Sequence, residues 1–122
     1  MIEYDANSPI YLQVIEDIKK RVISKELLLG QKLPSTRELA LRYEINPNTA
    51  ARVYSEMEGM GLCFTKRGLG TFLTEDEEYV KNLSEEAVNE LVKKFIKDIK
   101  LHGLSREEAI SKLEGDWNEV SL

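Results

Sequence analysis

The stretch from Leu33 to Phe72 reads LPSTRELALRYEINPNTAARVYSEMEGMGLCFTKRGLGTF and carries signals for two short helices followed by a glycine-containing hairpin. Ser35 followed by Glu38 forms a capping box, in which each side chain can accept a hydrogen bond from the other residue's backbone N–H. We expect a helix that begins at Thr36, carries apolar residues on one face and ends near Glu44.

A second helix is predicted to begin at Pro47, directly after Asn46. Asparagine caps a helix well, and proline costs nothing at the first helical position because its missing N–H would be unpaired there. Gly61 is well placed to end this helix in the left-handed conformation. Apolar residues at helical spacing predict a core-facing stripe of Ala50, Val53, Tyr54, Met57 and Met60.

The polar face of this second helix bears on whether the helix reads DNA or merely packs. Near its start it presents Asn48, Thr49 and Arg52, side chains of the kind that reach base edges and phosphates in a major groove. The helix N-terminus adds free N–H groups and a partial positive charge, which suit a phosphate. Taken alone, such a polar turn is more typical of a solvated surface helix, but the segments around it favour DNA binding.

A basic turn between two short strands follows the second helix. We expect strands at Leu62 to Thr65 and at Thr71 to Thr74, because glycines between them can adopt the positive φ that a tight turn needs. Glycine also allows a close approach to a sugar–phosphate wall, and Lys66 and Arg67 supply attracting charge. An ordinary hairpin with a solvated tip is the alternative. The position directly after a recognition helix favours a wing.

An amphipathic helix is predicted ahead of this region, from Pro9 to about Ser24. Its apolar stripe should cover the helix-turn-helix pair and consists of Tyr11, Val14, Ile15, Ile18 and Val22. The segment from Leu27 to Gly30 is expected to form a short connection with room for a first minor strand. The expected fold is therefore mainly α with a small β-hairpin wing, a winged helix-turn-helix.

The chain from Pro9 to Leu73 resembles the N-terminal winged-helix domain of GntR-type bacterial transcription regulators. The resemblance lies in PIYLQV at 9–14, GQKLPSTREL at 30–39, INPNTAARVY at 45–54 and RGLGTF at 67–72. The INPNT motif at 45–49 and the short C-terminal extension most resemble the YtrA subfamily, in which a small helical segment replaces a large effector-binding domain. We expect a DNA-binding domain at 8–76 and a helical dimerisation segment at 77–122.

The resemblance implies DNA contacts where individual residues match the family pattern. Arg37 matches an arginine that touches the phosphate backbone, and Gly68 matches a wing glycine that enters the minor groove. Pro47 and Ala51 stand where several relatives carry arginines, so Arg52 is the single basic residue of the recognition helix. The positions expected to contact DNA are Ser35, Thr36, Arg37, Asn46, Asn48, Thr49, Arg52, Lys66, Arg67, Gly68 and Gly70.

A long amphipathic helix is predicted from Tyr79 to about His102, after the acidic run Glu75 to Glu78. Its apolar stripe is too broad for one small domain to cover, so a second copy is expected to cover the rest. The expected dimer interface is Val80, Leu83, Ala87, Val88, Leu91, Val92, Phe95, Ile96 and Ile99. A second capping box, Ser105 with Glu108, should open a final helix whose Ala109, Ile110 and Leu113 pack back, with Trp117 as an anchor.

Charge is distributed unevenly along this chain of 122 residues, whose formal net charge is −5. Residues 1–74 hold ten Lys and Arg against nine Asp and Glu, a net of +1, and residues 75–122 hold seven against thirteen, a net of −6. The overall charge argues against a protein that coats nucleic acid indiscriminately. The first segment is expected to face DNA and the second to point away from it.

Several other functions are disfavoured by residue usage. Cys63, the single cysteine, has apolar neighbours that predict a buried strand residue, and a redox-sensing thiol is the alternative. His102, the single histidine, is expected to be structural at a helix end. We expect no catalytic residues, no cofactor and no metal site. No stretch suits a membrane span or a signal peptide, which predicts a cytoplasmic protein.

The sequence therefore predicts a sequence-specific transcription regulator, most simply a homodimeric repressor on an inverted-repeat operator in double-stranded DNA. The alternative is a winged-helix adaptor that docks a protein without reading DNA. The polar tip and basic wing favour DNA, because a protein-docking surface would more often expose aromatic or aliphatic anchors. The sequence leaves the operator, the regulated genes and any small-molecule effector unidentified.

Overall fold

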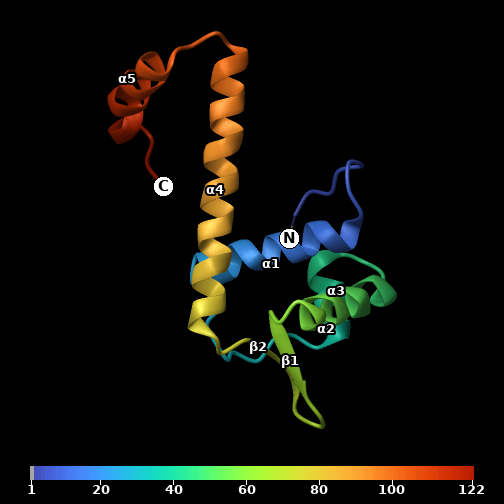
Figure 1. Cartoon of the computed structure of the whole chain (residues 1–122). Helices are drawn as coiled ribbons and strands as arrows, with labels where there is room; N and C mark the ends of the chain where they lie inside the picture. The colour runs from blue at the N-terminus through green and yellow to red at the C-terminus, as the bar shows by residue number, and fades with distance from the viewer. Residues whose placement is uncertain (1) are drawn as a thin grey trace. The chain divides into compact units, whose positions relative to one another are not determined.

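The computed structural model of the chain describes residues 2–122, which form two compact units divided between Ser84 and Glu85. The first unit contains α1 (Ile10–Ile23), α2 (Thr36–Tyr43), α3 (Pro47–Gly59), β1 (Cys63–Lys66), β2 (Gly70–Leu73) and the start of α4 (Glu77–Leu101). Three helices followed by an antiparallel hairpin confirm the predicted winged helix-turn-helix, as Figure 1 shows from blue to yellow-green.

The predicted helix boundaries in the helix-turn-helix are confirmed by their caps. The Ser35 hydroxyl accepts from the Glu38 N–H, and the Glu38 carboxylate accepts from the Ser35 N–H, each at 3.1 Å. Glu44 ends α2 in the left-handed region with φ of 54°. The Asn46 side chain caps α3, and Gly61 follows that helix with φ of +84°. These ends depend on groups within a few residues of one another, which is why spacing alone predicts them.

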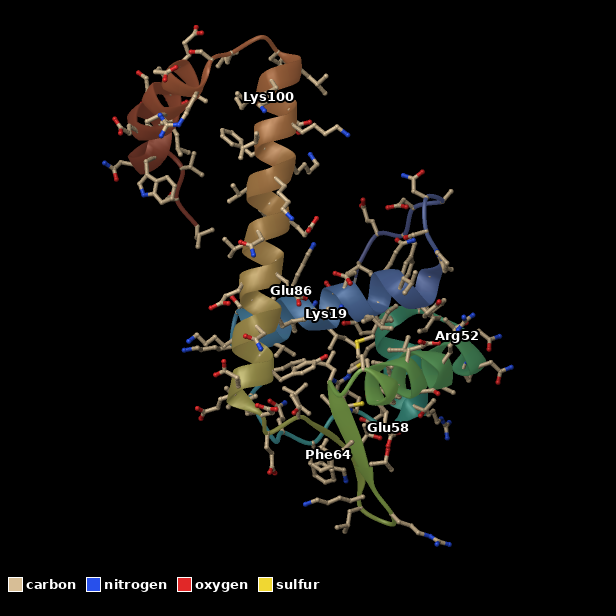
Figure 2. All side chains as sticks on the ribbon, viewed as in Figure 1. Lys19, Arg52, Glu58, Phe64, Glu86 and Lys100 are labelled. Atoms are coloured by element: carbon tan, nitrogen blue, oxygen red, sulfur yellow. The ribbon has the colours of Figure 1, made fainter. Side chains whose placement is uncertain are left out.

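Both strands of the hairpin lie one residue nearer the turn than expected, at Cys63–Lys66 and Gly70–Leu73. Cys63 pairs with Leu73, and Lys66 pairs with Gly70. Leu62 lies outside β1 because its N–H bonds to the Met57 carbonyl at the end of α3. On the hairpin, the rings of Phe64 (Figure 2) and Phe72 stack with centroids 5.8 Å apart. The tip is therefore shorter than expected, with three residues from 67 to 69 between the strands.

The minor strand expected at Leu27 to Gly30 lies slightly later in the chain. An isolated antiparallel bridge joins Lys32 to Phe72. It is flanked by two backbone hydrogen bonds of 2.8 Å, from Leu33 N–H to Thr71 and from Leu73 N–H to Gln31. Only this pairing between distant segments locates the short strand, because the local run of apolar residues lies earlier in the chain, at Leu27 to Leu29.

The core lies where α1, α2, α3 and the base of the hairpin meet. Tyr11, expected in the α1 stripe, is only half-buried, whereas the other four expected positions are buried. Met60, expected in the α3 stripe, is exposed because the helix ends at Gly59 and Met60 follows as its C-cap. The buried apolar side chains are Val14, Ile15, Ile18, Val22, Leu33, Leu39, Ala40, Tyr43, Ala50, Val53, Tyr54, Met57, Leu62, Cys63 and Leu73.

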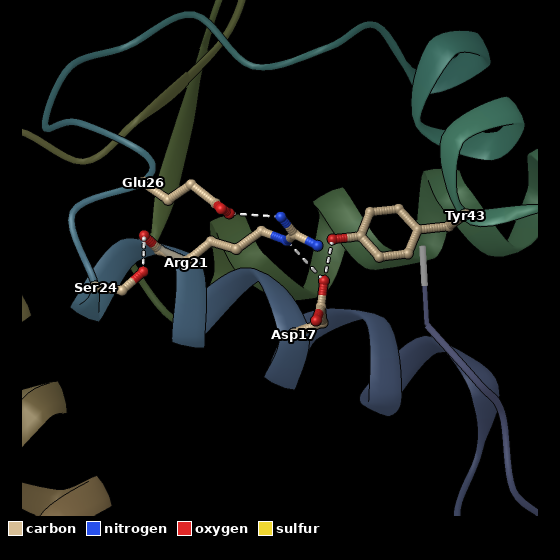
Figure 3. A network of polar contacts seen from close by, with 5 residues as sticks. All are labelled: Asp17, Arg21, Ser24, Glu26 and Tyr43. Carbon is tan, nitrogen blue, oxygen red and sulfur yellow. Dashed lines mark hydrogen bonds and ion pairs between the residues drawn. The ribbon is translucent and has the colours of Figure 1, made fainter. Parts of the chain in front are cut away.

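A polar network ties α1 to the end of α2 (Figure 3). The Tyr43 hydroxyl donates to the Asp17 carboxylate at 2.7 Å, and Arg21 donates to the same oxygen at 2.9 Å while also pairing with Glu26. Burial of Asp17 raises the pKa of its carboxyl, but hydrogen bonds from Tyr43 and Arg21 outweigh that effect and hold the pKa below its usual value. The network therefore fixes α2 on α1 with ionised Asp17 at its centre.

The second unit consists of the remainder of α4, followed by α5 (Arg106–Asp116) and a short 3-10 turn, η1 (Trp117–Glu119). The Ser105–Glu108 capping box at the start of α5 is confirmed. The expected return packing of this helix is wrong for a single chain, since Ile110 and Leu113 stay 38% and 45% exposed and Trp117 stays 67% exposed. So small a helical unit has no third layer to cover these side chains.

Replacing Tyr43 with phenylalanine should lower the free energy of unfolding by about 1–2 kcal/mol at neutral pH, because Asp17 loses one of its donors. The folded-state pKa of Asp17 is lowered, so this contribution is present above the ordinary carboxyl pKa of about 3.9 and is lost as the pH falls through the folded value. Urea unfolding at pH 7 and in acid measures both effects.

Tyr11→Phe is the matched control, because the structure records no hydrogen bond for the Tyr11 hydroxyl within residues 2–122. Equal losses of stability in the two variants, or a Tyr43→Phe loss that persists at the lowest pH, would contradict the role assigned to the Tyr43–Asp17 hydrogen bond.

Candidate nucleic-acid interface

The first turn of α2 supplies one group of predicted DNA contacts. Ser35 and Glu38 satisfy each other's backbone N–H groups, so the Ser35 hydroxyl oxygen is already an acceptor and offers its O–H as a donor. Thr36 is half-buried as the first residue of the helix, and Arg37 is exposed. Arg37 joins no ion pair within residues 2–122, so its guanidinium is available to a phosphate.

The first turn of α3 supplies the predicted base-reading tip. The Asn46 side-chain oxygen accepts from the Asn48 N–H at 2.7 Å, which leaves the Asn46 amide N–H groups as outward donors. Asn48 is exposed and Thr49 is half-buried. The helix therefore presents polar side chains of both hydrogen-bonding kinds around its N-terminus, as a helix entering a groove end-first requires.

Arg52 has a partner within the chain that the sequence did not reveal. Its guanidinium carbon lies 3.8 Å from the centroid of the Tyr11 ring on α1, a stacking geometry typical of cation–π contacts. Its Nε also lies 3.8 Å from a Glu56 carboxylate oxygen one turn along α3. The side chain is still 58% exposed. Arg52 is thus oriented by α1, and its base contact stays a prediction.

The wing carries two cations in different settings. The Lys66 ammonium lies 5.7 Å from the Phe64 ring centroid and 5.3 Å from that of Phe72, over a pair of stacked rings. Arg67 is exposed in the turn and joins no ion pair in the described chain. Arg67 is therefore the freer of the two charges, and Lys66 is held beside the aromatic face of the hairpin.

The two wing glycines both have positive φ, but their surroundings differ. Gly68 has φ of +79°, and a Cβ built there meets no atom within 4 Å. Gly70 has φ of +122°, and a Cβ there would lie only 2.9 Å from the Lys32 side chain. Gly68 fits the expected role of an open tip that approaches DNA, whereas Gly70 has a positive φ that favours glycine and leaves space for the end of the Lys32 side chain.

Recognition helix α3 is tied to the approach of α2 by a hydrogen bond that sequence reasoning missed. The Tyr54 hydroxyl donates to the Pro34 carbonyl oxygen at 2.5 Å, and burial raises the pKa of that hydroxyl above its usual value. The two groups are 20 residues apart in the chain, so no local spacing could have paired them. This bond helps to hold the N-terminal turns of α2 and α3 in one arrangement.

Burial also bears on the alternative of a redox-sensing thiol. Cys63 is buried, and that burial raises the pKa of its thiol to about 11, with the Glu58 carboxylate contributing. A thiol with a raised pKa is mostly protonated at neutral pH and is a poor nucleophile. The predicted core role is therefore the one the structure supports.

Two further observations concern the described residues as a whole. Within residues 2–122, no group of three or more His, Cys, Asp or Glu side chains is arranged so that it could hold a metal ion. Among the helices of the same residues, none has the length and hydropathy needed to cross a membrane.

The expected dimer stripe divides into two parts along α4. Val80 and Leu83 are partly buried and pack against the core of the first unit. The large apolar side chains farther along are substantially exposed, namely Val88 (52%), Leu91 (69%), Val92 (50%), Phe95 (44%) and Ile96 (45%). A single chain therefore leaves most of the stripe in water.

Comparison with known proteins agrees with this geometry. The family model for bacterial regulatory proteins of the gntR family matches residues 10–73. The chain is 44% identical over 108 residues to the uncharacterized HTH-type transcriptional regulator YhcF of Bacillus subtilis (strain 168), across 88% of this chain and 89% of that protein. It is 42% identical over 78 residues to the HTH-type transcriptional repressor YtrA of the same organism, across 62% of this chain and 60% of the repressor.

Solved structures show the same fold. A GntR family transcriptional regulator from Listeria monocytogenes superimposes with a TM-score of 0.84 at 33% identity, covering 92% of this chain and 98% of that one. The DNA-binding domain of AraR in complex with operator ORX1 matches with a TM-score of 0.54 at 26% identity, covering 60% of this chain and 93% of that domain. A winged helix-turn-helix of this kind is therefore found in a protein bound to its operator.

Arg37→Ala should weaken binding to every duplex and lower the slope of log affinity against log salt by roughly one unit, because a phosphate contact carries no sequence information. Fluorescence anisotropy over a salt series measures both quantities. Arg106→Ala, which removes an exposed arginine of the second unit, is the control. A salt slope for Arg37→Ala equal to that of the parent would rule out the phosphate contact.

Arg52→Ala should cost about 1–3 kcal/mol of binding free energy on the preferred site and relax the preference at one base position. Tyr11→Leu should weaken the same preference while keeping the guanidinium, since Arg52 loses the ring that orients it. Titration against a set of sites that differ by single base pairs tests this. If Arg52→Ala keeps the base preferences of the parent, Arg52 does not read a base and its role is limited to its contacts within the chain.

Proposed function

The chain belongs to the GntR family of bacterial regulatory proteins and is a DNA-binding transcription regulator, and we propose that it acts as a homodimeric repressor on an inverted-repeat operator. The observation that carries the proposal is the polar first turns of α2 and α3 beside a basic wing within one compact unit. Membership of a family of helix-turn-helix regulators and this polar and basic surface both favour DNA binding over the alternative of a protein-docking adaptor. A regulator of bacterial promoters works beside the chromosome, so we infer a cytoplasmic location.

DNA contacts in this proposal divide by chemistry. We assign base reading to Asn48, Thr49 and the oriented guanidinium of Arg52, which lie in the first turns of α3. Phosphate contacts come from Arg37 and the wing, because exposed cations without ion pairs neutralise phosphates most readily. The wing residues in the proposal are Lys66, Arg67, Gly68 at the tip and Gly70. The remaining proposed contacts are the Ser35 hydroxyl, Thr36 and the Asn46 amide.

The dimer is proposed from the exposed part of α4. Side chains such as Leu91 and Phe95 stay in water in a single chain, although burying a large apolar side chain contributes about 1.5–3 kcal/mol. A second copy supplies an equivalent apolar face, as a two-fold interface requires. Val80 and Leu83 have part of their surface on the domain core, so we place the centre of the interface from Ala87 to Ile99.

The domain boundary that we propose falls before α4, eight residues ahead of the division between the two compact units at Ser84 and Glu85. Residues 8–76 form the DNA-binding domain, and residues 77–122 form the dimerisation segment. The first turns of α4 pack on the core of that domain through Tyr79 and Val80, which gives the segment a fixed starting point. Asp76 fixes the start of α4, because its carboxylate accepts from the Tyr79 N–H at 3.1 Å.

An inverted repeat follows from two-fold symmetry, because two identical domains related by a two-fold axis read the same half-site on opposite strands. Tethering two weakly binding domains makes the second contact intramolecular, and this can raise apparent affinity by about a hundredfold or more. A dimer that occupies a promoter in this way excludes the polymerase. Repression by occlusion therefore needs no further domain.

We include no small-molecule effector in the proposal. A hollow of about 450 Å³ lies among α1, α2 and α3, lined by Leu39, Tyr43 and Tyr54 among others. The two tyrosine hydroxyls already donate to Asp17 and Pro34. Of the charged residues that line the hollow, Arg21 and Glu26 pair with each other, whereas Arg42 joins no ion pair within residues 2–122. The lining therefore does not identify a ligand.

Leu91→Glu and Phe95→Glu should convert the dimer to a monomer, because each places a charged carboxylate in an apolar interface. Affinity for a full palindrome should then fall by about a hundredfold, to the affinity of a single half-site. Sedimentation velocity reports assembly, and titration on palindromic and half-site duplexes reports affinity.

Asn89→Glu is the matched control, since it adds one charge to α4 outside the apolar stripe and should leave both measurements unchanged. The proposal fails if the Leu91→Glu and Phe95→Glu variants stay dimeric. It also fails if they become monomeric and still bind the palindrome as tightly as the parent does.

A further inference from the structure

We propose that Lys32 is an additional contact to the DNA backbone phosphates and that Gly70 positions it, an inference that rests on the DNA-binding function. Lys32 lies in the connection before α2, outside both the predicted recognition helix and the wing turn. The structure links it to the wing and to the first turn of α2, the two elements to which phosphate contacts are assigned. The ligand chemistry is that of a phosphodiester oxygen.

The backbone of Lys32 is fixed to the wing. Lys32 forms an antiparallel bridge with Phe72 of β2, and hydrogen bonds of 2.8 Å on both sides, from Leu33 N–H and from Leu73 N–H, hold the bridge. Lys32 therefore behaves as part of a third, very short strand. A cation on a paired strand loses less conformational entropy on binding than one on a free loop.

The Lys32 side chain crosses directly over Gly70. A Cβ at Gly70 would lie 2.9 Å from Lys32 Cε, 3.6 Å from Nζ and 3.9 Å from Cδ. Cβ atoms essentially never approach another atom to under 3.0 Å, so a side chain at this position would push the flexible end of the lysine aside. The missing side chain at Gly70 thus provides the space in which the Lys32 ammonium lies at the wing.

The charge of Lys32 is free for an external partner. Lys32 is exposed and takes part in none of the ion pairs found within residues 2–122. The hydrogen bond from the Ser35 backbone is the main cause of the lowered pKa of the Glu38 carboxyl, and the charges of Arg42 and Lys32 lower it further. Lys32 therefore lies within electrostatic range of the first turn of α2, while Glu38 is occupied by its capping box.

Register places a second cation on the same face of this small sheet. Lys32 is opposite Phe72, which is opposite Phe64, and side chains of directly paired residues share a face. Lys66 is two residues beyond Phe64 and so belongs to that face, with its ammonium over the two rings. The other face of the hairpin is buried at its base by Cys63 and Leu73. Two lysines thus lie on the solvent side of the wing, where a phosphate backbone can meet both.

Lys32→Met tests the phosphate contact, because it removes the charge and keeps a similar apolar chain over Gly70. Anisotropy titrations of a random-sequence duplex and of the selected operator, each over a salt series, should show an affinity reduced about fivefold on both duplexes near 0.1 M salt. The salt slope should fall by roughly one unit. Lys20→Met, an exposed lysine of α1 in the same unit, is the control and should change neither quantity.

An unchanged salt slope in Lys32→Met overturns the inference while leaving DNA binding by the parent intact. Failure of the parent to bind any duplex would instead overturn the proposed function. The two failures are therefore distinguishable in one set of titrations. Unfolding temperatures measured alongside separate a loss of contact from a loss of fold.

A double-mutant cycle tests the role of Gly70. Gly70→Ala should reduce affinity more in the parent than in the Lys32→Met variant, because only the parent has a charge to displace. Backbone strain at φ of +122° is present in both backgrounds and cancels in the comparison. Gly68→Ala is strained at positive φ but meets no neighbour, so it should show no coupling to Lys32. Equal effects of Gly70→Ala in both backgrounds would remove Gly70 from the proposal, and an unfolded Gly70→Ala variant would leave the Lys32→Met titrations to decide it.

Discussion

Burial of the α1 stripe beneath the helix-turn-helix pair is the interaction on which every DNA-facing element depends. Val14, Ile15 and Ile18 are between 0% and 4% exposed and pack in the same core as the inward residues of α3. Each such side chain contributes about 1.5–3 kcal/mol by leaving water. Because that burial sets how α3 lies on α1, it also sets where the N-terminus of the recognition helix points.

Polar contacts then refine an arrangement that apolar burial alone would leave loose. Asp17 accepts from Tyr43 on α2, and Tyr54 on α3 donates to Pro34 ahead of α2, so each helix of the pair has a directional link to another segment. At the helix starts, Ser35 and Asn46 use their oxygens for capping. Their outward groups are therefore mainly donors, which suits phosphate oxygens and base acceptors.

The wing combines a rigid base with an open tip. Stacked Phe64 and Phe72 and the bridge to Lys32 stiffen the hairpin where it leaves the core, whereas Gly68 at the turn has no neighbour within reach of an added Cβ. The Lys66 ammonium, at the end of β1 next to the turn, lies over the two stacked rings, whereas Arg67 in the turn joins no ion pair within residues 2–122 and is freer to adapt. This difference in rigidity matches the contrast between positioning contacts and groove contacts in protein–DNA recognition.

Spacing along the chain was enough to locate the elements whose ends are satisfied locally. The starts of α2, α3 and α5 are set by Ser35, Asn46 and Ser105, which cap N–H groups two or three residues away, so no knowledge of distant segments was needed. The order of two short helices and a hairpin already predicted a winged helix, and the family resemblance added individual DNA contacts such as Arg37 and Gly68.

Contacts between side chains of different elements could be learned from the folded chain alone. The stacking of Arg52 on Tyr11 and the crossing of Lys32 over Gly70 join residues that are far apart in the chain. Neither pair follows a helical or strand period, because each depends on how whole elements pack rather than on neighbouring backbone groups. The same reason explains why the return packing predicted for Ile110 failed, since amphipathic spacing indicates an apolar face but does not identify what covers it.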